Sequence, residues 1–136
     1  MAMDFSAVMK ALRARGKPNT AVIYRRHGVR EETFGVSYVD VGALTKKIGL
    51  DHELALALWK SGNHDARVLA TKIADPARAT PALVQAWLTD ADNYVITDAL
   101  SGLAARMPAA ADLARRWTQG DGEWETTSRR SPPARG

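Results

Sequence analysis

Apolar residues recur at helical spacing along most of this chain, and this pattern constrains the fold more than any other feature. In "HDARVLATKIAD" (64–75) they stand at i, i+3, i+4 and i+7, namely at Ala66, Leu69, Ala70 and Ile73. The stretches "PALVQAWLTDA" (81–91) and "NYVITDALSGLAARM" (93–107) repeat this spacing. One apolar stripe per helix predicts an all-α chain in which each helix packs against its neighbours.

The residues at the segment ends indicate helices joined by short turns. Thr80 followed by Pro81 is typical of a helix N-cap with proline at the first helical position, and Gly49 is a typical helix stop. The stretch "LALALW" (54–59) alternates like a strand, but its Ala and Leu content and the start signal at Asp51 favour a helix. The expected helices are 4–15, 18–27, 37–48, 51–61, 63–74, 80–91, 93–106 and 108–118.

Many helices of similar length in series predict a helical repeat array, an α-α superhelix, rather than a four-helix bundle. Trp59, Trp87 and Trp117 stand at apolar helical positions and are expected to pack between repeats. The 136 residues suit one domain, placed at 1–125, whereas "TTSRRSPPARG" (126–136) has no large apolar residue and is predicted to be a disordered basic tail. No signal peptide, membrane-length apolar run or cysteine is visible, so we expect a cytoplasmic protein.

The charge balance is basic. Nineteen Lys and Arg residues against fifteen Asp and Glu residues give a net charge of +4 and a pI near 9.7. Such a charge favours association with polyanions but does not by itself identify a partner. Arg25, Arg26 and His27 form the densest basic cluster in the folded part, and we expect this cluster to attract DNA.

Three further cations, Arg67, Lys46 and Lys47, are candidate phosphate contacts. Arg67 lies on the side of its helix away from the apolar stripe. There it either contacts a DNA phosphate or pairs at the surface with Asp65 or Asp75. Lys46 and Lys47 either contact the DNA backbone or serve only as solubilising charge.

The histidines do not indicate a metal site. His27, His52 and His64 lie in three different helices without the spacing of metal ligands, so no metal is expected. His52 directly follows a cap and is predicted to be structural, and His64 shares the outward side of its helix with Arg67 and Thr71. The sequence contains no phosphate-cradling loop, no nucleophile motif and no dinucleotide fingerprint, so no cofactor is expected.

The most specific pattern in the chain lies between residues 25 and 76. The FGVS turn (34–37), the "LTKKIG" helix, "DHELALALW" and above all "GNHDARVLATKIADP" (62–76) resemble the DNA alkylation repair (AlkD-like) family of HEAT-repeat proteins. The resemblance covers roughly residues 18 to 125. It implies an α-helical superhelix with a concave, positively charged face that holds duplex DNA.

Active members of that family excise cationic alkylated purines, such as 3-methyladenine and 7-methylguanine, by hydrolysing the N-glycosidic bond. They do so without flipping the base into a pocket, unlike most glycosylases. Other members bind DNA but lack this activity. The resemblance therefore implies a DNA glycosylase acting on alkylated duplex DNA or, as the alternative, a non-catalytic helical-repeat scaffold that binds DNA or protein.

Asp98 stands inside an expected helix, although aspartate is a poor helix former. Helical geometry places one set of residues opposite the apolar stripe of Ile96, Ala99, Leu100 and Leu103: Tyr94, Asp98, Ser101 and Ala105. The small members of this set leave open space beside the carboxylate and the ring, on which a ligand backbone fits. In the alternative interpretation Asp98 caps a neighbouring helix or faces water, and Tyr94 packs between repeats.

The active family pattern places a tryptophan one turn before the catalytic aspartate, and Tyr94 and Asp98 fall on these positions. The resemblance thus implies that Asp98 is the key carboxylate and Tyr94 its aromatic partner, with tyrosine in place of tryptophan. A cationic alkylpurine is a good leaving group, so the barrier lies in the positive charge that develops on the deoxyribose. A carboxylate near C1′ stabilises that charge and orients water, and an aromatic ring adds a cation–π attraction.

Family domains are longer than this chain, and their later repeats supply a second aromatic wall and a basic residue of the cleft. Here the helical pattern ends just after "GDGEWE" (120–125). Repeat arrays need polar terminal caps, so we expect an apolar face at the C-terminal end to associate and form a homodimer.

Overall fold

The computed structural model describes residues 3–91 and 93–108, and this part of the chain contains seven α-helices and no strand. The helices are α1 (Phe5–Arg15), α2 (Pro18–Arg26), α3 (Tyr38–Ile48), α4 (His52–Lys60), α5 (His64–Ile73), α6 (Pro81–Asp90) and α7 (Tyr94–Arg106). The predicted all-α fold is confirmed, and 54–59 is helical as predicted. Most of the helix expected at 108–118, Trp117, the tail and the expected dimer surface lie outside the described residues.

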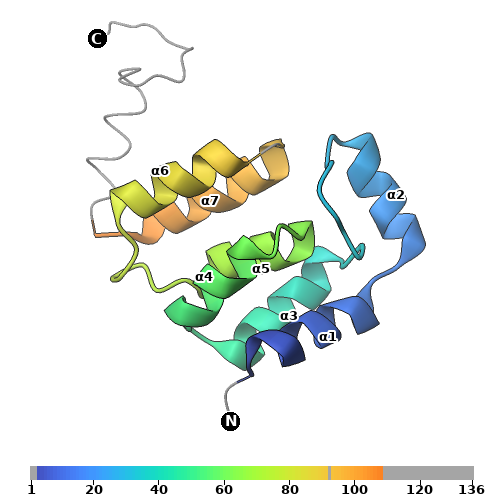
Figure 1. Ribbon diagram of the computed structural model, residues 1–136, viewed down its shortest axis with the longest axis horizontal. Helices are drawn as coiled ribbons and strands as arrows, with labels where there is room; N and C mark the ends of the chain where they lie inside the picture. Colours follow the sequence, from blue (N-terminus) through green and yellow to red (C-terminus); the bar gives the residue numbers. More distant parts are fainter. Residues whose placement is uncertain (1–2, 92, 109–136) are drawn as a thin grey trace, which may run out of the picture.

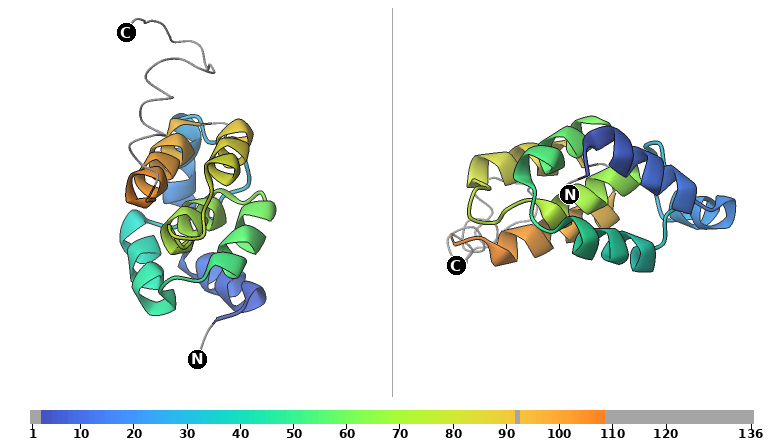
Figure 2. Two further views of the ribbon diagram at one scale, coloured as in Figure 1. Left: turned by 90° about the vertical axis from the view of Figure 1, so that its left-hand side faces the viewer. Right: turned by 90° about the horizontal axis from the view of Figure 1, so that it is seen from below.

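The helices form two layers, which the left view of Figure 2 shows end on. One layer contains α1, α4 and α6, and the other contains α3, α5 and α7. The central helix α5 packs against α4 of the opposite layer and against α3 and α7 of its own layer. Helix α2 stands at one end of the layers, near the turn between α6 and α7 (Figure 1). This pairwise stacking is the repeat architecture predicted from the sequence.

Helix α5 is buried on almost every side, because helices of both layers surround it. Eight of its ten residues are buried, and only Arg67 and Lys72 are partly exposed. The prediction that His64 and Thr71 face outward is therefore wrong, since each is 1% exposed. Arg67 is also largely covered, with 14% of its side chain exposed. The apolar stripe identified one buried side of α5, but the polar residues opposite are buried as well.

Two predictions about inter-repeat packing are confirmed. The indole rings of Trp59 and Trp87 stack between α4 and α6 with centroids 4.5 Å apart and an interplanar angle of 5°, and both residues are buried. His52 is structural, because its Nδ1 accepts a hydrogen bond from the backbone N–H of Asp75 at 3.2 Å. This bond ties the start of α4 to the end of α5.

The segment between α2 and α3 is held in place by Asp65 of α5. The Asp65 carboxylate accepts hydrogen bonds from the backbone N–H groups of Phe34 and Val36 at 2.6 and 3.1 Å. It also accepts one from the Thr33 hydroxyl at 3.0 Å. The three donors and the Asp65 carboxylate thus satisfy one another's hydrogen-bonding needs inside the protein.

The FGVS turn depends on the glycine at its second position. Gly35 has a φ of 78°, and a Cβ added there would meet the Lys17 carbonyl oxygen at 2.3 Å. Only glycine combines this backbone conformation with so close an approach. The turn then leads to Ser37, whose side chain accepts a hydrogen bond from the Asp40 N–H and caps α3. The FGVS turn therefore determines where α3 begins.

Candidate functional site

Two adjoining cavities of about 360 and 520 Å³ lie between α3 and α7, with α5 between these helices. We call them together the α3–α7 groove. Its lining residues are Tyr38, Gly42, Thr45 and Lys46 of α3, Val68 and Lys72 of α5, and Tyr94, Val95, Asp98, Ala99, Gly102 and Arg106 of α7. Both cavities share Tyr38, Lys72, Asp98 and Ala99, so these four residues mark the centre of the groove.

Asp98 and Tyr94 lie on the groove side of α7, and both are exposed. The Asp98 carboxylate accepts no hydrogen bond from any residue that the structure describes, so it caps none of the described helices. Tyr94 is 58% exposed and its hydroxyl lies 3.4 Å from Nδ1 of His27. The side of α7 that was predicted to be accessible is exposed, at Tyr94, Asp98, Ser101 and Ala105.

One member of the predicted apolar stripe of α7 lies elsewhere. Ile96, Leu100 and Leu103 are buried, but Ala99 is only partly buried and lines the groove. The buried stripe is narrower than predicted, because α7 packs mainly against α5 and α6. The side of α7 that carries Ala99 borders the groove instead. A methyl group next to Asp98 keeps this part of the groove wide.

Tyr38 faces Asp98 and Tyr94 from α3, and the sequence did not single it out. It is 54% exposed and lines both cavities. Partial burial raises the pKa of its phenol, and the nearby Tyr94 and Asp98 raise it further. The groove thus has an aromatic ring on both of its helical walls and a carboxylate beside one of them. The sequence feature that could have identified Tyr38 is its position directly after Ser37, the N-cap of α3.

Three cations accompany the single carboxylate in the groove: Lys46, Lys72 and Arg106. Only Lys46 was among the sequence candidates. Arg106 is fixed, because its guanidinium donates hydrogen bonds to the carbonyls of Thr71 at 2.8 Å and Gly102 at 3.1 Å. Lys72 and Arg106 were missed because each stands near the C-terminal end of its helix, where cations are common for helix stability alone.

The remaining predicted cations lie outside the groove lining. Lys47 is exposed on α3. Arg25 and Arg26 are exposed at the end of α2, and the contact between His27 and Tyr94 brings that end next to the start of α7. The Arg25–Arg26 cluster is therefore adjacent to the groove.

Arg67 is engaged inside the protein rather than in the groove. Its Nε donates to the Trp59 carbonyl at 3.1 Å, Nη1 donates to Glu31 at 3.0 Å, and the guanidinium stacks on the Trp59 ring at 4.6 Å. The alternative of surface pairing with Asp65 or Asp75 is wrong, since the acid that pairs with Arg67 is Glu31. Sequence separation hid this pair, because its members are 36 positions apart.

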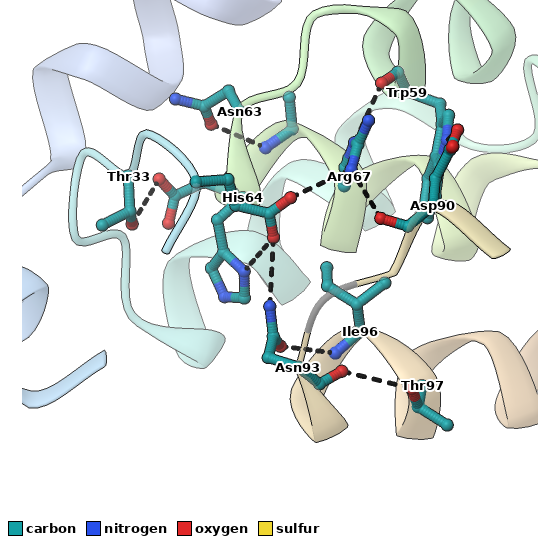
Figure 3. A network of polar contacts seen from close by, with 12 residues as sticks. Thr33, Trp59, Asn63, His64, Arg67, Asp90, Asn93, Ile96 and Thr97 are labelled. Atoms are coloured by element: carbon teal, nitrogen blue, oxygen red, sulfur yellow. Dashed lines mark hydrogen bonds and ion pairs between the residues drawn. The ribbon is translucent and has the colours of Figure 1, made fainter. Parts of the chain in front are cut away.

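Glu31 is the centre of a largely buried polar network, and Figure 3 shows its partners His64, Arg67 and Asn93. Its carboxylate contacts His64 Nδ1 at 3.2 Å and accepts hydrogen bonds from Arg67 at 3.0 Å and the Asn93 amide at 3.1 Å. Burial acts to raise the pKa of Glu31, but the His64 hydrogen bond, the positive charge of Arg67 and the Asn93 hydrogen bond lower it overall. Glu31 therefore stays ionised inside the protein.

Within the described residues, no three His, Cys, Asp or Glu side chains gather as metal ligands would. No helix among them is long and apolar enough to cross a membrane.

A solved structure shares this architecture, with a TM-score of 0.82 and 35% sequence identity over 88% of this chain and 52% of that chain. It is described as "a new family of proteins related to the HEAT-like repeat DNA glycosylases with affinity for branched DNA structures". The fold is therefore that of a HEAT-like helical repeat protein. The chain belongs to the DNA alkylation repair enzyme family, whose family model matches residues 8–129.

Two curated relatives are similar over most of this chain. An uncharacterized protein of Listeria monocytogenes is 25% identical over 125 residues, and one of Listeria innocua is 24% identical over the same length. Each alignment covers 88% of this chain and 56% of the relative. The chain thus spans about half the length of the relatives it matches.

Proposed function

We propose that this protein binds DNA in the α3–α7 groove and hydrolyses the N-glycosidic bond of cationic alkylpurines there. The observation that carries the proposal is the position of Asp98. Its carboxylate is exposed at the centre of a groove whose other charged lining residues are all cations. A carboxylate that no described residue neutralises is available to a cationic transition state.

The proposed chemistry requires no protonation of the leaving base, because cleavage neutralises a cationic purine. Positive charge develops instead at C1′ of the deoxyribose, and Asp98 stabilises it and orients the attacking water. Tyr94 and Tyr38 offer aromatic faces to the sugar or the cationic base. Lys46, Lys72 and Arg106 contact phosphates and position the strand without reading its sequence.

The direct test is the release of 7-methylguanine from methylated duplex DNA at saturating protein. We expect Asp98→Asn to slow release about 100-fold, as loss of one preorganised electrostatic group does. Glu53→Gln is the matched control, because Glu53 is an exposed acid on α4 that pairs only with Arg78 among the described residues. Absence of release by the wild-type protein, or release that survives Asp98→Asn, contradicts the catalytic proposal.

DNA binding is tested separately on unmodified duplex. Lys72→Gln is expected to weaken binding and to reduce the slope of log K against log salt by about 0.9, as for one lost phosphate contact. Lys60→Gln, an exposed lysine at the end of α4, is the control and should leave the slope unchanged. Equal slopes for both variants would place the DNA outside the groove.

A steric plug tests the groove without changing its charge. Gly102 lines the groove, and a Cβ added there meets no heavy atom within 4 Å. Gly102→Phe should therefore fold normally and block DNA binding, whereas Gly102→Ala should keep binding and stabilise α7 by about 0.5–1 kcal/mol. Undiminished binding by Gly102→Phe would contradict the site.

A second candidate function is binding of branched DNA without base excision. The description of the similar solved structure, which attributes affinity for branched DNA to that family, favours it. Tighter binding to a four-way junction than to a linear duplex, together with no release of 7-methylguanine, would support it. No affinity for either DNA would leave the non-catalytic protein-binding scaffold.

A further inference from the structure

The start of α7 is tied to residues far away in the sequence. Asn93 caps α7, since its side-chain oxygen accepts a hydrogen bond from the Ile96 N–H at 3.0 Å. The amide of the same side chain donates to Glu31 at 3.1 Å, across 62 residues of sequence (Figure 3). One side chain therefore both begins the helix that carries Tyr94 and Asp98 and attaches it to the segment before α3.

Glu31 is itself fixed to α5. His64 and Arg67, one turn apart on α5, hold the two carboxylate oxygens at 3.2 and 3.0 Å. Arg67 in turn donates to the carbonyl of Trp59 at 3.1 Å and contacts that of Asp90 at 3.5 Å, so the ends of α4 and α6 join the same network. Only 9% of the Glu31 side chain is exposed, so water competes little for these bonds.

The network meets the other wall of the groove through aromatic contacts. The ring centroids of His64 and Tyr24 are 5.3 Å apart, and those of Tyr24 and Tyr38 are 5.9 Å apart. Tyr24 is fixed by its hydroxyl, which donates to the Val36 carbonyl at 2.6 Å. The rings on both walls of the groove thus rest on groups that contact either Glu31 or its partner His64.

We propose that Glu31 is a positioning residue: through Asn93 it fixes the start of α7 against α5, and so sets the distance of Asp98 and Tyr94 from Tyr38. Glu31 touches no substrate in this role. The effect on base release rests on the proposed function, whereas the effect on α7 does not.

The test separates capping from tethering at one position. Asn93→Ser keeps a good N-cap residue, but its hydroxyl is too short to reach Glu31. Its thermal midpoint should stay close to that of the wild type. We expect hydrogen exchange of the Thr97 and Asp98 amides to accelerate about tenfold relative to amides of α5, which marks local loosening of α7.

Glu31→Gln should loosen α7 in the same way, and the double variant Glu31→Gln with Asn93→Ser should show no more exchange at these amides than Glu31→Gln alone. Glu53→Gln, which removes an exposed ion pair with Arg78, is the matched control and should leave α7 unchanged. If Glu31→Gln fails to fold, Asn93→Ser alone decides the question.

The second readout is base release at saturating protein. A misplaced Asp98 should lower the release rate of Asn93→Ser about tenfold while the Kd for unmodified duplex changes less than about twofold. Unchanged exchange at Thr97 and Asp98 in both variants overturns the proposal, whatever happens to the rate. Accelerated exchange in a protein whose wild type releases no base supports the positioning role and contradicts only the proposed glycosylase.

Discussion

Two charged clusters share helix α5, which contributes Arg67 to one and Lys72 to the other, but they differ in how their charges are used. In the network around Glu31 and Arg67, each charge is covered by other residues and has at least one partner within 3.0 Å. In the α3–α7 groove, Asp98, Lys46 and Lys72 form no hydrogen bond or ion pair with any residue that the structure describes. The first cluster holds helices together, and the second is available to a ligand.

The difference shows that residue type and helical position do not decide between a structural and a binding role. Arg67 and Lys72 both lie on α5, yet only Lys72 reaches the groove. Arg67 is surrounded by partners that come from distant segments. A buried charge must be paired, whereas an exposed charge at a groove contributes little to folding.

The largest expected effect is on the buried cluster. Arg67→Ala removes the partner of Glu31 and leaves that carboxylate buried without its cation, which should cost about 3–5 kcal/mol of unfolding free energy. Urea denaturation measures this loss. The groove counterpart Lys72→Ala should change the free energy of unfolding by less than about 0.5 kcal/mol. Similar losses in the two variants would abolish the contrast.

The dependence of stability on acid pH should also differ between the buried cluster and the groove. Glu31→Gln should cost about 2 kcal/mol at neutral pH, because charged hydrogen bonds are lost. The folded-state pKa of Glu31 is lowered, so its contribution is present above the ordinary pKa of a glutamate and is lost as the pH falls through the folded value. The stability gap between wild type and Glu31→Gln should therefore close in acid, while the gap for Lys72→Gln stays constant.

A smaller effect distinguishes a buried tyrosine from an exposed one. Tyr24→Phe removes the hydrogen bond to the Val36 carbonyl and should cost about 1 kcal/mol. Burial, aided by Tyr38 and Asp65, raises the pKa of Tyr24 to about 12. Its contribution is therefore present below the ordinary tyrosine pKa and is lost as the pH rises through the folded value. Tyr94→Phe should have almost no effect in chemical denaturation at neutral pH.

The smallest effect on stability is expected at the proposed catalytic residue. Asp98→Asn should change the free energy of unfolding by less than about 0.5 kcal/mol, because no described residue bonds to the carboxylate. Thermal and urea unfolding of the purified variant measure this. A clear loss of stability would show that Asp98 belongs with the structural charges.

The sequence predicted what depends on a single helix. The N-caps Asp51 and Thr80, the helical state of 54–59 and the open side of α7 around Asp98 all follow from local spacing, and all are present. Cap chemistry and apolar periodicity act within one or two turns, so they can be read from adjacent residues.

The composition of the groove could not be predicted in the same way, because three helices distant in sequence build it. Periodicity shows which side of a helix is apolar, but not which neighbour covers the other side. The sequence therefore could not show that other segments cover Arg67. Nor could it show that the groove leaves three residues accessible, namely Tyr38, Lys72 and Arg106. Ala99 was placed in the core for the same reason.

The bonds from Asp65 to the segment before α3 also bear on the order of folding. They join residues up to 32 positions apart, so a long loop must close before they form. The segment has no regular structure of its own to hold it while α5 is undocked. We therefore expect the α3 wall to reach its final place late, after the central helix has packed, and mutations in the FGVS turn to act mainly on the unfolding rate.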